Sequence, residues 1–431
     1  MALVRIFCLA LILTTQITGL QGTRLPRKVL SFPIANAAFT TLVENKTAPQ
    51  GQRWNFYASA FSAIPFSKDY VYVVRGIERY LLKNSTNVKP DVVTHDTVWP
   101  NEISGVPAEV FGKPTLAVPD GFLLPTKTAG DIGIYDINVN PPRGPFRISH
   151  DDNDKQNWFY HRVIWKDMNG DGRLDAVAAR AEKPFFGNAK GELLWFEHPS
   201  GDPFTSQWKP HLLLNGPDTF IINATMKVGN GVYDTIIAPQ FFSQALVVYW
   251  SVAPLMLWTD PSKIRSVIID DKVGPAFDAR VVDLNADQKP DLLVTSNQAQ
   301  NGAVFAYQLD YNLPLENTTF VKHVLADGFT PRQSGQGKGS PGAAKPFYPS
   351  LKNATGKPHI LVCGDDDGRA YLLIPQSADP SNWKYSKEVF FDGGKETVGE
   401  IAIEDVDGDG FVEVFVPLYY KGEVIVFSFG P

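Results

Sequence analysis

A short acidic turn between two strand-like segments recurs along this chain and constrains its fold more than any other feature. The copies begin at Asp167, Asp283 and Asp405. In the fullest unit, from Arg162 to Leu214, a second strand, a glycine turn, an aromatic strand and a basic-apolar strand follow the acidic turn. Helical periodicity is scarce elsewhere, and short apolar or alternating runs bounded by Gly, Pro, Asn and Asp dominate. The pattern predicts an all-β chain built from a repeated four-stranded unit.

The spacing of the acidic turns gives the number of units. The intervals between them are 116 and 122 residues, too long for one unit of four short strands. Degenerate copies of the turn stand near the two midpoints, at 226–234 and 351–359. A period of about 58 residues divides the chain into seven units. Seven four-stranded units without a capping helix predict a seven-bladed β-propeller, a ring that leaves only short, protected strand edges.

Closure of the ring can be predicted from the two ends of the repeat. The last unit ends near Phe427 without a basic-apolar strand, whereas earlier units end in one. The run Arg27 to Phe32 has the missing character. We therefore expect the N-terminal strand to pair with the last blade.

The first 22 residues predict a cleaved secretory signal. Arg5 precedes an apolar run over 6–13, and small residues follow at Gly19 and Gly22. We expect residues 1–22 to be removed, residues 23–431 to form one propeller domain, and the protein to be secreted. No later segment approaches the roughly 20 apolar residues of a membrane span. Five glycosylation sequons fit the same route, at Asn45, Asn84, Asn223, Asn317 and Asn353.

Charge and motifs exclude several function classes. The formal net charge of −6 and the pI near 5.7 argue against nucleic acid as a partner. The chain carries no Gly-x-Ser-x-Gly elbow, His-Glu-x-x-His motif or P-loop. We expect no organic cofactor.

The acidic turns have the ligand spacing of calcium loops. Oxygen ligands stand at loop positions 1, 3, 5 and 9, with a backbone carbonyl available at position 7, and Ca²⁺ prefers such hard ligands. Strands follow where an EF-hand would place its position-12 Glu. The alternative is an Asx-rich turn without metal, and the second loop has Gln288 where the others have Gly. The expected ligands are Asp167, Asn169, Asp171, Arg173 and Asp175; Asp283, Asn285, Asp287 and Asp291; and Asp405, Asp407, Asp409 and Glu413.

These loops resemble those of the FG-GAP/VCBS class of β-propeller. The resemblance covers the blades from about residue 158 onward and implies a Ca²⁺ loop between the first two strands of a blade. It specifies fold rather than function.

The face opposite the acidic loops is where we expect a ligand, near the ring axis. It should be built from segments before each first strand and turns after each second strand. The candidates for substrate binding are Trp54, Trp158, Tyr160, Phe241, Phe242, Asp278, Asn297 and Tyr420. The candidates for catalysis are His161, Arg180 and Lys421. The alternative is structural: aromatic packing between blades, a satisfied core histidine and surface charges.

Such an aromatic face with isolated polar groups suits a flat, mostly apolar organic ligand or a sugar ring. A secreted single propeller of this kind resembles the fungal hetero-Diels-Alderases of tropolone-sesquiterpenoid biosynthesis and, more weakly, the first propeller of aldos-2-ulose dehydratase. The resemblance implies an enzyme that holds a small apolar or aromatic substrate for cycloaddition or dehydration, with no catalytic motif to transfer. The alternative is a glycan-binding lectin or an adhesion propeller without catalysis.

Overall fold

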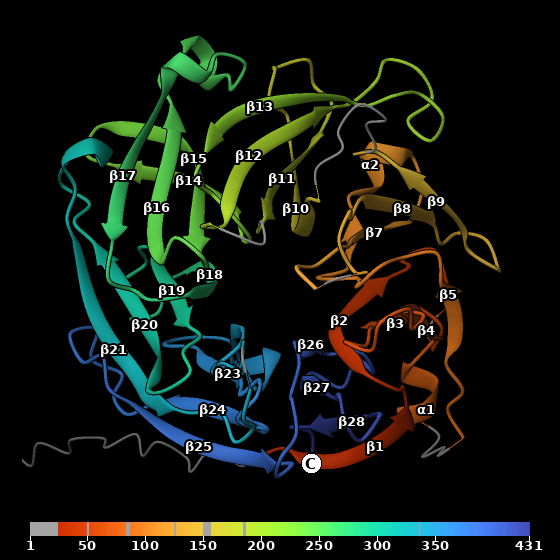
Figure 1. Ribbon diagram of the computed structural model, residues 1–431. Helices are drawn as coiled ribbons and strands as arrows, with labels where there is room; N and C mark the ends of the chain where they lie inside the picture. Colours follow the sequence, from red (N-terminus) through yellow and green to blue (C-terminus); the bar gives the residue numbers. More distant parts are fainter. Residues whose placement is uncertain are drawn as a thin grey trace, which may run out of the picture.

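The computed structural model describes residues 25–431 except positions 50, 83–86, 125, 150–156, 184–186 and 336, and gives only the backbone of residue 353. The predicted signal peptide and the sequon at Asn84 lie outside the described residues. Seven four-stranded antiparallel sheets are arranged as the blades of a ring (Figure 1). The predicted all-β fold and the predicted blade number are confirmed.

Blades 1 to 4 follow one another along the chain. Blade 1 consists of β2 (Ala37–Glu44), β3 (Trp54–Ala60), β4 (Tyr70–Arg75) and β5 (Asp91–Thr94). Blade 2 consists of β6 (Ser104–Val106), β7 (Thr115–Pro119), β8 (Ile132–Asp136) and β9 (Arg143–Arg147). Blade 3 consists of β10 (Phe159–Lys166), β11 (Asp175–Glu182), β12 (Lys190–Glu197) and β13 (Lys209–Asn215). Blade 4 consists of β14 (Ile222–Val228), β15 (Gly231–Gln240), β16 (Ala245–Ser251) and β17 (Ile264–Asp270).

Blades 5 to 7 complete the ring. Blade 5 consists of β18 (Ala276–Val282), β19 (Asp291–Ser296), β20 (Gly302–Leu309) and β21 (Phe320–Phe329). Blade 6 consists of β22 (Ala344–Phe347), β23 (His359–Cys363), β24 (Arg369–Pro375) and β25 (Tyr385–Asp392). Blade 7 joins β26 (Ala402–Glu404), β27 (Glu413–Leu418) and β28 (Glu423–Ser428) to β1 (Arg27–Pro33).

Helical structure is confined to the connections. The short segments are α1 (Glu78–Leu82), α2 (Ala108–Phe111), η1 (Pro254–Met256), η2 (Pro261–Lys263), η3 (Leu315–Asn317) and η4 (Leu351–Asn353). None of the helices in the described ranges is long and apolar enough to cross a membrane.

The ring closes through the strand predicted to close it. β1 pairs antiparallel with β28, from Arg27 opposite Ser428 to Pro33 opposite Glu423. Figure 1 shows β1 beside the C-terminus at the outer edge of blade 7. Leu30 and Phe32 of β1 are buried in a cluster that blades 7 and 1 share. The last blade is therefore built from both ends of the described chain.

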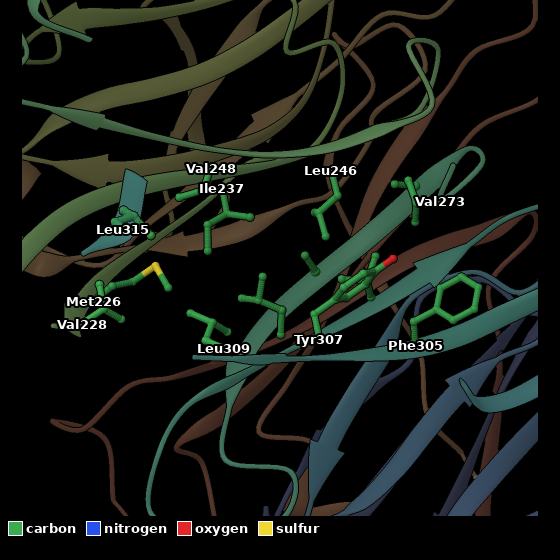
Figure 2. Packing of buried hydrophobic residues seen from close by; sticks show 14 of the residues in the cluster. Met226, Val228, Ile237, Leu246, Val248, Val273, Phe305, Tyr307, Leu309 and Leu315 are labelled. Carbon is green, nitrogen blue, oxygen red and sulfur yellow. The ribbon is translucent and has the colours of Figure 1, made fainter. Parts of the chain in front are cut away.

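Seven apolar layers hold neighbouring blades together. Side chains alternate between the two faces of a strand, so Ala176 and Ala178 of β11 pack toward blade 2 while Val177 and Ala179 pack toward blade 4. Both faces of a central strand are thus buried, which explains its apolar sequence without polar alternation. Figure 2 shows the layer between blades 4 and 5, where Met226 and Leu246 face Tyr307.

The strand order also separates two faces of the ring. The first strand of each blade lies innermost and leads into the connection that carries an acidic turn in blades 3, 5 and 7. The midpoint copies at 226–234 and 351–359 fall in the same connection of blades 4 and 6. The other face is formed by the turns after each second strand and by the links between blades.

Candidate functional site

The three acidic loops share one backbone arrangement. In each loop the first carboxylate accepts hydrogen bonds from two N–H groups three to five positions further on: Asp167 from Gly170 and Gly172 at 2.7 and 2.9 Å, and Asp405 from Gly408 and Gly410 at 2.9 and 3.0 Å. Asp283 accepts in the same way from residues 287 and 288, at 3.2 and 2.7 Å. The sequence pattern therefore fixes a loop conformation that gathers oxygen atoms.

The third loop comes nearest to a formed cation site. Oxygen atoms of Asp405, Asp407 and Glu413 lie within 4.8 Å of one another. Burial raises the pKa of Glu413 to about 8, and the nearby Asp407 adds to the shift. In the first loop the Asp171 carboxylate instead pairs with the Arg173 guanidinium. Elsewhere in the described ranges no group of three His, Cys, Asp or Glu side chains converges in this way. The donor set of the third loop fits Ca²⁺, which takes carboxylate and carbonyl oxygen ligands.

The second loop adopts the shared conformation against the preference of its residues. Ala286 and Gln288 have φ of +64° and +68°, where the first loop has Gly170 and Gly172 at +80° and +83°. A side chain in the left-handed region costs about 1–2 kcal/mol because Cβ crowds the backbone. The sequence showed that Gln288 replaces a glycine of the other loops. The positive φ of Ala286, at the position that Gly170 holds in the first loop, is known only from the structure.

Relieving this strain should stabilise the protein. We expect Ala286→Gly and Gln288→Gly each to raise the free energy of unfolding by about 0.5–1 kcal/mol, measured by urea denaturation, because glycine adopts a positive φ readily but loses more backbone entropy on folding. Gly172→Ala is the matched control. A Cβ at Gly172 would meet no atom within 4 Å, so only its φ matters and the variant should lose about 1–2 kcal/mol. Equal stability of all three variants would contradict the strain argument.

A cavity of about 280 Å³ lies on the opposite face, at the inner ends of the blades. Its walls come from the inter-blade links and the turns after second strands, as expected for a propeller's ligand face. Its aromatic side is formed by Phe39, Phe61, Trp99 and Phe122, which come from blades 1 and 2 and the link between them. Its polar side is formed by Lys338, Asp365, Asp366 and Thr397, which come from blade 6 and the links on either side of it.

The aromatic side is a stack of three rings held in place by a strained backbone. Trp99 stacks on Phe61 and Phe122 with ring centroids 4.1 and 4.6 Å apart. Its φ is +52°, which is rare for a bulky side chain. The backbone N–H of Trp99 donates to the Asp69 carboxylate at 2.7 Å, and Lys127 forms a buried ion pair with the same carboxylate at 2.7 Å. Such strain persists where surrounding structure holds it, often at a binding site.

The polar side carries two adjacent carboxyl groups with different partners. Asp366 accepts from the Lys338 ammonium at 2.8 Å and from the Thr397 hydroxyl at 2.7 Å. Asp365 accepts from the Asn297 amide at 2.9 Å. Burial raises the pKa of Asp365 well above its usual range, and the neighbouring Asp366 raises it further. The lining of the cavity thus combines an aromatic wall with a carboxyl group that favours its neutral form.

His161 is one of the residues that line this cavity. Its ring lies 4.3 Å from the Phe220 ring and 5.0 Å from the Phe39 ring. Burial, with the Arg162 charge, lowers the pKa of His161 to about 3. Nδ1 is buried and has no hydrogen-bond partner among the described residues. The ring is therefore neutral near pH 7 and can exchange a hydrogen bond with a ligand but cannot act as a cationic acid.

A network of charged side chains adjoins His161. Arg162 donates to Glu102 at 2.8 and 2.9 Å and to Asp278 at 2.8 Å. Burial alone would raise the pKa of Asp278, but Arg280 and Arg162 together hold it below its usual value. Glu400, a wall residue of the cavity, pairs with Lys345 at 2.7 Å. The network joins first strands from several blades and fixes the residues around the axis.

Of the eleven side chains proposed from sequence for this face, His161 and Tyr420 line the cavity. Asn297 supports it by its bond to Asp365. Asp278 belongs to the charge network. Phe241 packs 6.3 Å from Phe277, which lines the cavity, and Phe242 packs 6.3 Å from Phe159. These positions lie together because the connections of different blades meet at the axis.

The remaining candidates lie elsewhere. Trp158 and Tyr160 are buried in the layer between blades 2 and 3. Arg180 stacks on Trp158 at 4.2 Å and pairs with Glu192 at 2.7 Å. Lys421 is exposed in the turn after β27. Trp158, Tyr160 and Arg180 therefore have structural roles in packing and in an ion pair, and they do not line the cavity.

The placement of Trp54 on the ligand face was wrong. Trp54 begins β3, a second strand, and pairs with Glu44 at the end of β2. It therefore lies on the face of the acidic loops. The connection before it, 45–53, carries no acidic turn. The sequence therefore did not show which strand of blade 1 comes first.

Several wall residues were absent from the sequence proposal, including Phe39, Phe61, Trp99, Phe122 and Lys338. Asp365 and Asp366 were recognisable as a turn after a strand, but the burial of Asp366 was not. Lys338 comes from a glycine-rich stretch. Backbone hydrogen bonds of 3.0 and 3.1 Å between Ser340 and Gln298 hold this stretch beside the cavity.

The structure also places Cys363 and the predicted glycosylation sequons. The Cys363 thiol is buried, and burial raises its pKa to about 12, so it remains protonated. Among the sequons, Asn223 and Asn317 are exposed and Asn45 is half-buried.

Comparisons with known proteins identify the fold. No protein-family model matches the chain, and no curated protein matches its sequence. The solved structure of the Dos1 propeller is similar, with a TM-score of 0.50 and 10% identity, over 94% of this chain and 96% of that one. A glucose dehydrogenase gives a TM-score of 0.42 at 10% identity over 78% of this chain and 97% of that one. NanB sialidase from Streptococcus pneumoniae gives 0.40 at 12% identity over 94% and 71%. The likeness to the Dos1 propeller, with the seven sheets described above, establishes a seven-bladed β-propeller.

Proposed function

We propose that this protein is a secreted, calcium-stabilised propeller of the FG-GAP/VCBS type whose central cavity binds a flat, largely apolar organic molecule. The presence of the Phe61–Trp99–Phe122 stack in the same cavity as Asp365 and Asp366 carries the proposal. Aromatic faces favour ring systems, and a few polar groups fix their orientation. A ligand with a flat apolar body and an oxygen function at one end matches both sides.

We propose further that the bound molecule reacts in a cyclisation or dehydration of the hetero-Diels–Alder type. Such chemistry is accelerated by holding two reactants in contact at the right orientation, and it needs no catalytic triad. The cavity would also keep water from a reactive intermediate. Neutral His161 can orient a carbonyl or hydroxyl oxygen. The cavity is built from unlike residues of different blades, whereas a propeller lectin would present equivalent pockets that repeat from blade to blade.

A ligand screen by thermal shift tests the binding step. Calcium-loaded, deglycosylated protein is melted with terpenes and tropolone-like or phenolic compounds in one set, and with sugars and glycans in the other. We expect the first set to raise the melting temperature. Trp99→Ala should remove this effect, because the stack loses its central ring. Trp383→Ala is the matched control, since Trp383 stacks on His323 away from the cavity. Stabilisation by sugars alone would favour the glycan-binding alternative.

A further inference from the structure

We propose that a second pocket beside the central cavity binds an oxyanion, so that the preferred ligands of this protein are flat apolar rings that carry a carboxylate or a sulfate group. The inference rests on the proposed function, because it requires the ring to lie in the central cavity. It adds the charge of the ligand and a residue that selects for it, Lys395, which neither the repeat nor any sequence motif singled out.

The second pocket shares a wall with the central cavity. It has a volume of about 440 Å³ and is lined by Arg332, Gln333, Ser334, Lys395 and Tyr420. Tyr420 lines both spaces. The Gln333 amide also donates a hydrogen bond of 3.0 Å to the hydroxyl of Thr397, which lines the central cavity. One ligand can therefore place its ring in the central cavity and a polar group beside Tyr420.

The lining of the second pocket consists of hydrogen-bond donors. Each of its five residues carries a donor: a guanidinium, an ammonium, an amide and two hydroxyl groups. None of these five side chains is a carboxylate. Such donors bind carboxylate and sulfate oxygens, most strongly where the donor is itself charged. An ammonium group on a ligand would meet like charges here.

Lys395 supplies a positive charge that no acid of the surroundings offsets. It is exposed in the link between blades 6 and 7 and forms no ion pair within the described ranges. The carboxylates of Asp367 and Asp392 beside the pocket already pair with the guanidinium groups of Arg332 and Arg369, at 2.7 to 4.0 Å. The Lys395 ammonium is therefore available to a ligand.

The other acids along the two spaces do not oppose an anionic ligand strongly. Asp366 and Glu400 each pair with a lysine ammonium, at 2.8 and 2.7 Å. Asp365 favours its neutral form, because burial and the Asp366 charge raise its pKa. Glu396 is buried, and its carboxylate accepts three backbone N–H groups at 2.6 to 3.0 Å. A ligand carboxylate beside Lys395 therefore gains more from the cation than it loses to these groups.

The experiment compares three probes that share one ring: 2-naphthoate, 2-naphthyl sulfate and the neutral 2-naphthamide. Isothermal titration calorimetry measures their dissociation constants. We expect at least one anion to bind about tenfold more tightly than the amide, the effect of one hydrogen bond between charged groups. Lys395→Ala should remove this preference and leave the affinity for 2-naphthamide unchanged. Lys395→Arg should keep most of it, and added salt should weaken it.

Lys272→Ala is the matched control for the loss of one positive charge. Lys272 is an exposed lysine in the link between blades 4 and 5, on the same face of the ring, and it lines neither space. It should retain the anion preference of the unmodified protein. Substitution of an exposed side chain changes stability little, so Lys395→Ala and Lys272→Ala should melt alike.

The outcomes separate this inference from the proposed function. Binding of 2-naphthamide that Trp99→Ala abolishes, without a preference for either anion, would overturn the inference and leave the proposed function standing. An anion preference that survives in Lys395→Ala would overturn the role of the second pocket. Failure of the unmodified protein to bind any of the three probes or any member of the apolar set would remove the proposed function and this inference with it.

Discussion

Arg162→Ala should destabilise the protein by about 3–5 kcal/mol, the range for breaking a buried ion pair by removal of one partner. Arg162 is 5% exposed and is the shared partner of Glu102 and Asp278. Its loss leaves Glu102 buried without its nearest cation. The loss of a guanidinium therefore costs more than the hydrogen bonds alone, because the remaining charges cannot reach water. Urea denaturation followed by tryptophan fluorescence measures the effect.

A conservative variant keeps this prediction testable if Arg162→Ala does not fold. Arg162→Lys preserves the charge but cannot bond Glu102 and Asp278 through a guanidinium. Its free energy of unfolding should therefore lie between those of the unmodified protein and Arg162→Ala. Arg265→Ala is the control: Arg265 is exposed on β17, and its guanidinium donates to the carbonyls of Ser262 and Ile264. We expect its free energy of unfolding to change by less than about 0.5 kcal/mol. Equal effects at 162 and 265 would show that the network does not hold the inner strands.

Removal of calcium should lower the melting temperature strongly. A ligand that binds only the folded state at a hundred times its dissociation constant stabilises by about 2.7 kcal/mol per site. Asp405→Ala should remove the largest share of the effect of chelation, because three of the four acidic side chains of its loop already converge within 4.8 Å. Asp167→Ala together with Asp405→Ala should abolish most of it. Differential scanning calorimetry with and without a chelator gives the measurement.

The control for the calcium experiment is an acidic residue outside the three loops. Asp310 lies in the connection after β20, and Asp310→Ala should leave the response of the melting temperature to chelator unchanged. An identical melting curve with and without chelator in the unmodified protein would contradict the calcium proposal. A response that survives in the double variant would assign the metal to other residues.

The sequence predicted the fold well because the fold depends on local signals. The turn chemistry at Asp167, Asp283 and Asp405 marks the same connection in three blades, and the apolar character of Arg27–Phe32 identified the closing strand across the whole chain. Central strands such as β11 are apolar on both faces because they contact two neighbouring blades. These features repeat, so the arithmetic of the repeat gave the blade number.

The cavity could be predicted only in part because its residues do not repeat. Trp99 and Phe122 follow no spacing that relates them to Lys338 or Asp365, and they meet only because the ring brings distant connections to one axis. The two faces could be assigned in a blade whose acidic loop marks the end of its first strand. His161, on the strand before the loop that begins at Asp167, was assigned in this way. Blade 1 lacks such a loop, and there Trp54 was placed on the wrong face. The surroundings of Asp365 depend on Asn297 after β19 and on Val398 before β26, and they leave no local signature in the sequence.

The pairing of β1 with β28 also sets an order of events when the chain is made. The two strands are separated by about 400 residues, which at about 5–20 residues per second take roughly 20–80 s to synthesise. During that time β1 has no partner in its own blade, and Leu30 and Phe32 have no complete layer to enter. An unpaired apolar strand edge invites pairing with another chain. A molecule whose synthesis stops before β28 keeps this edge open, so burial of the first strand reports that the whole ring has been made.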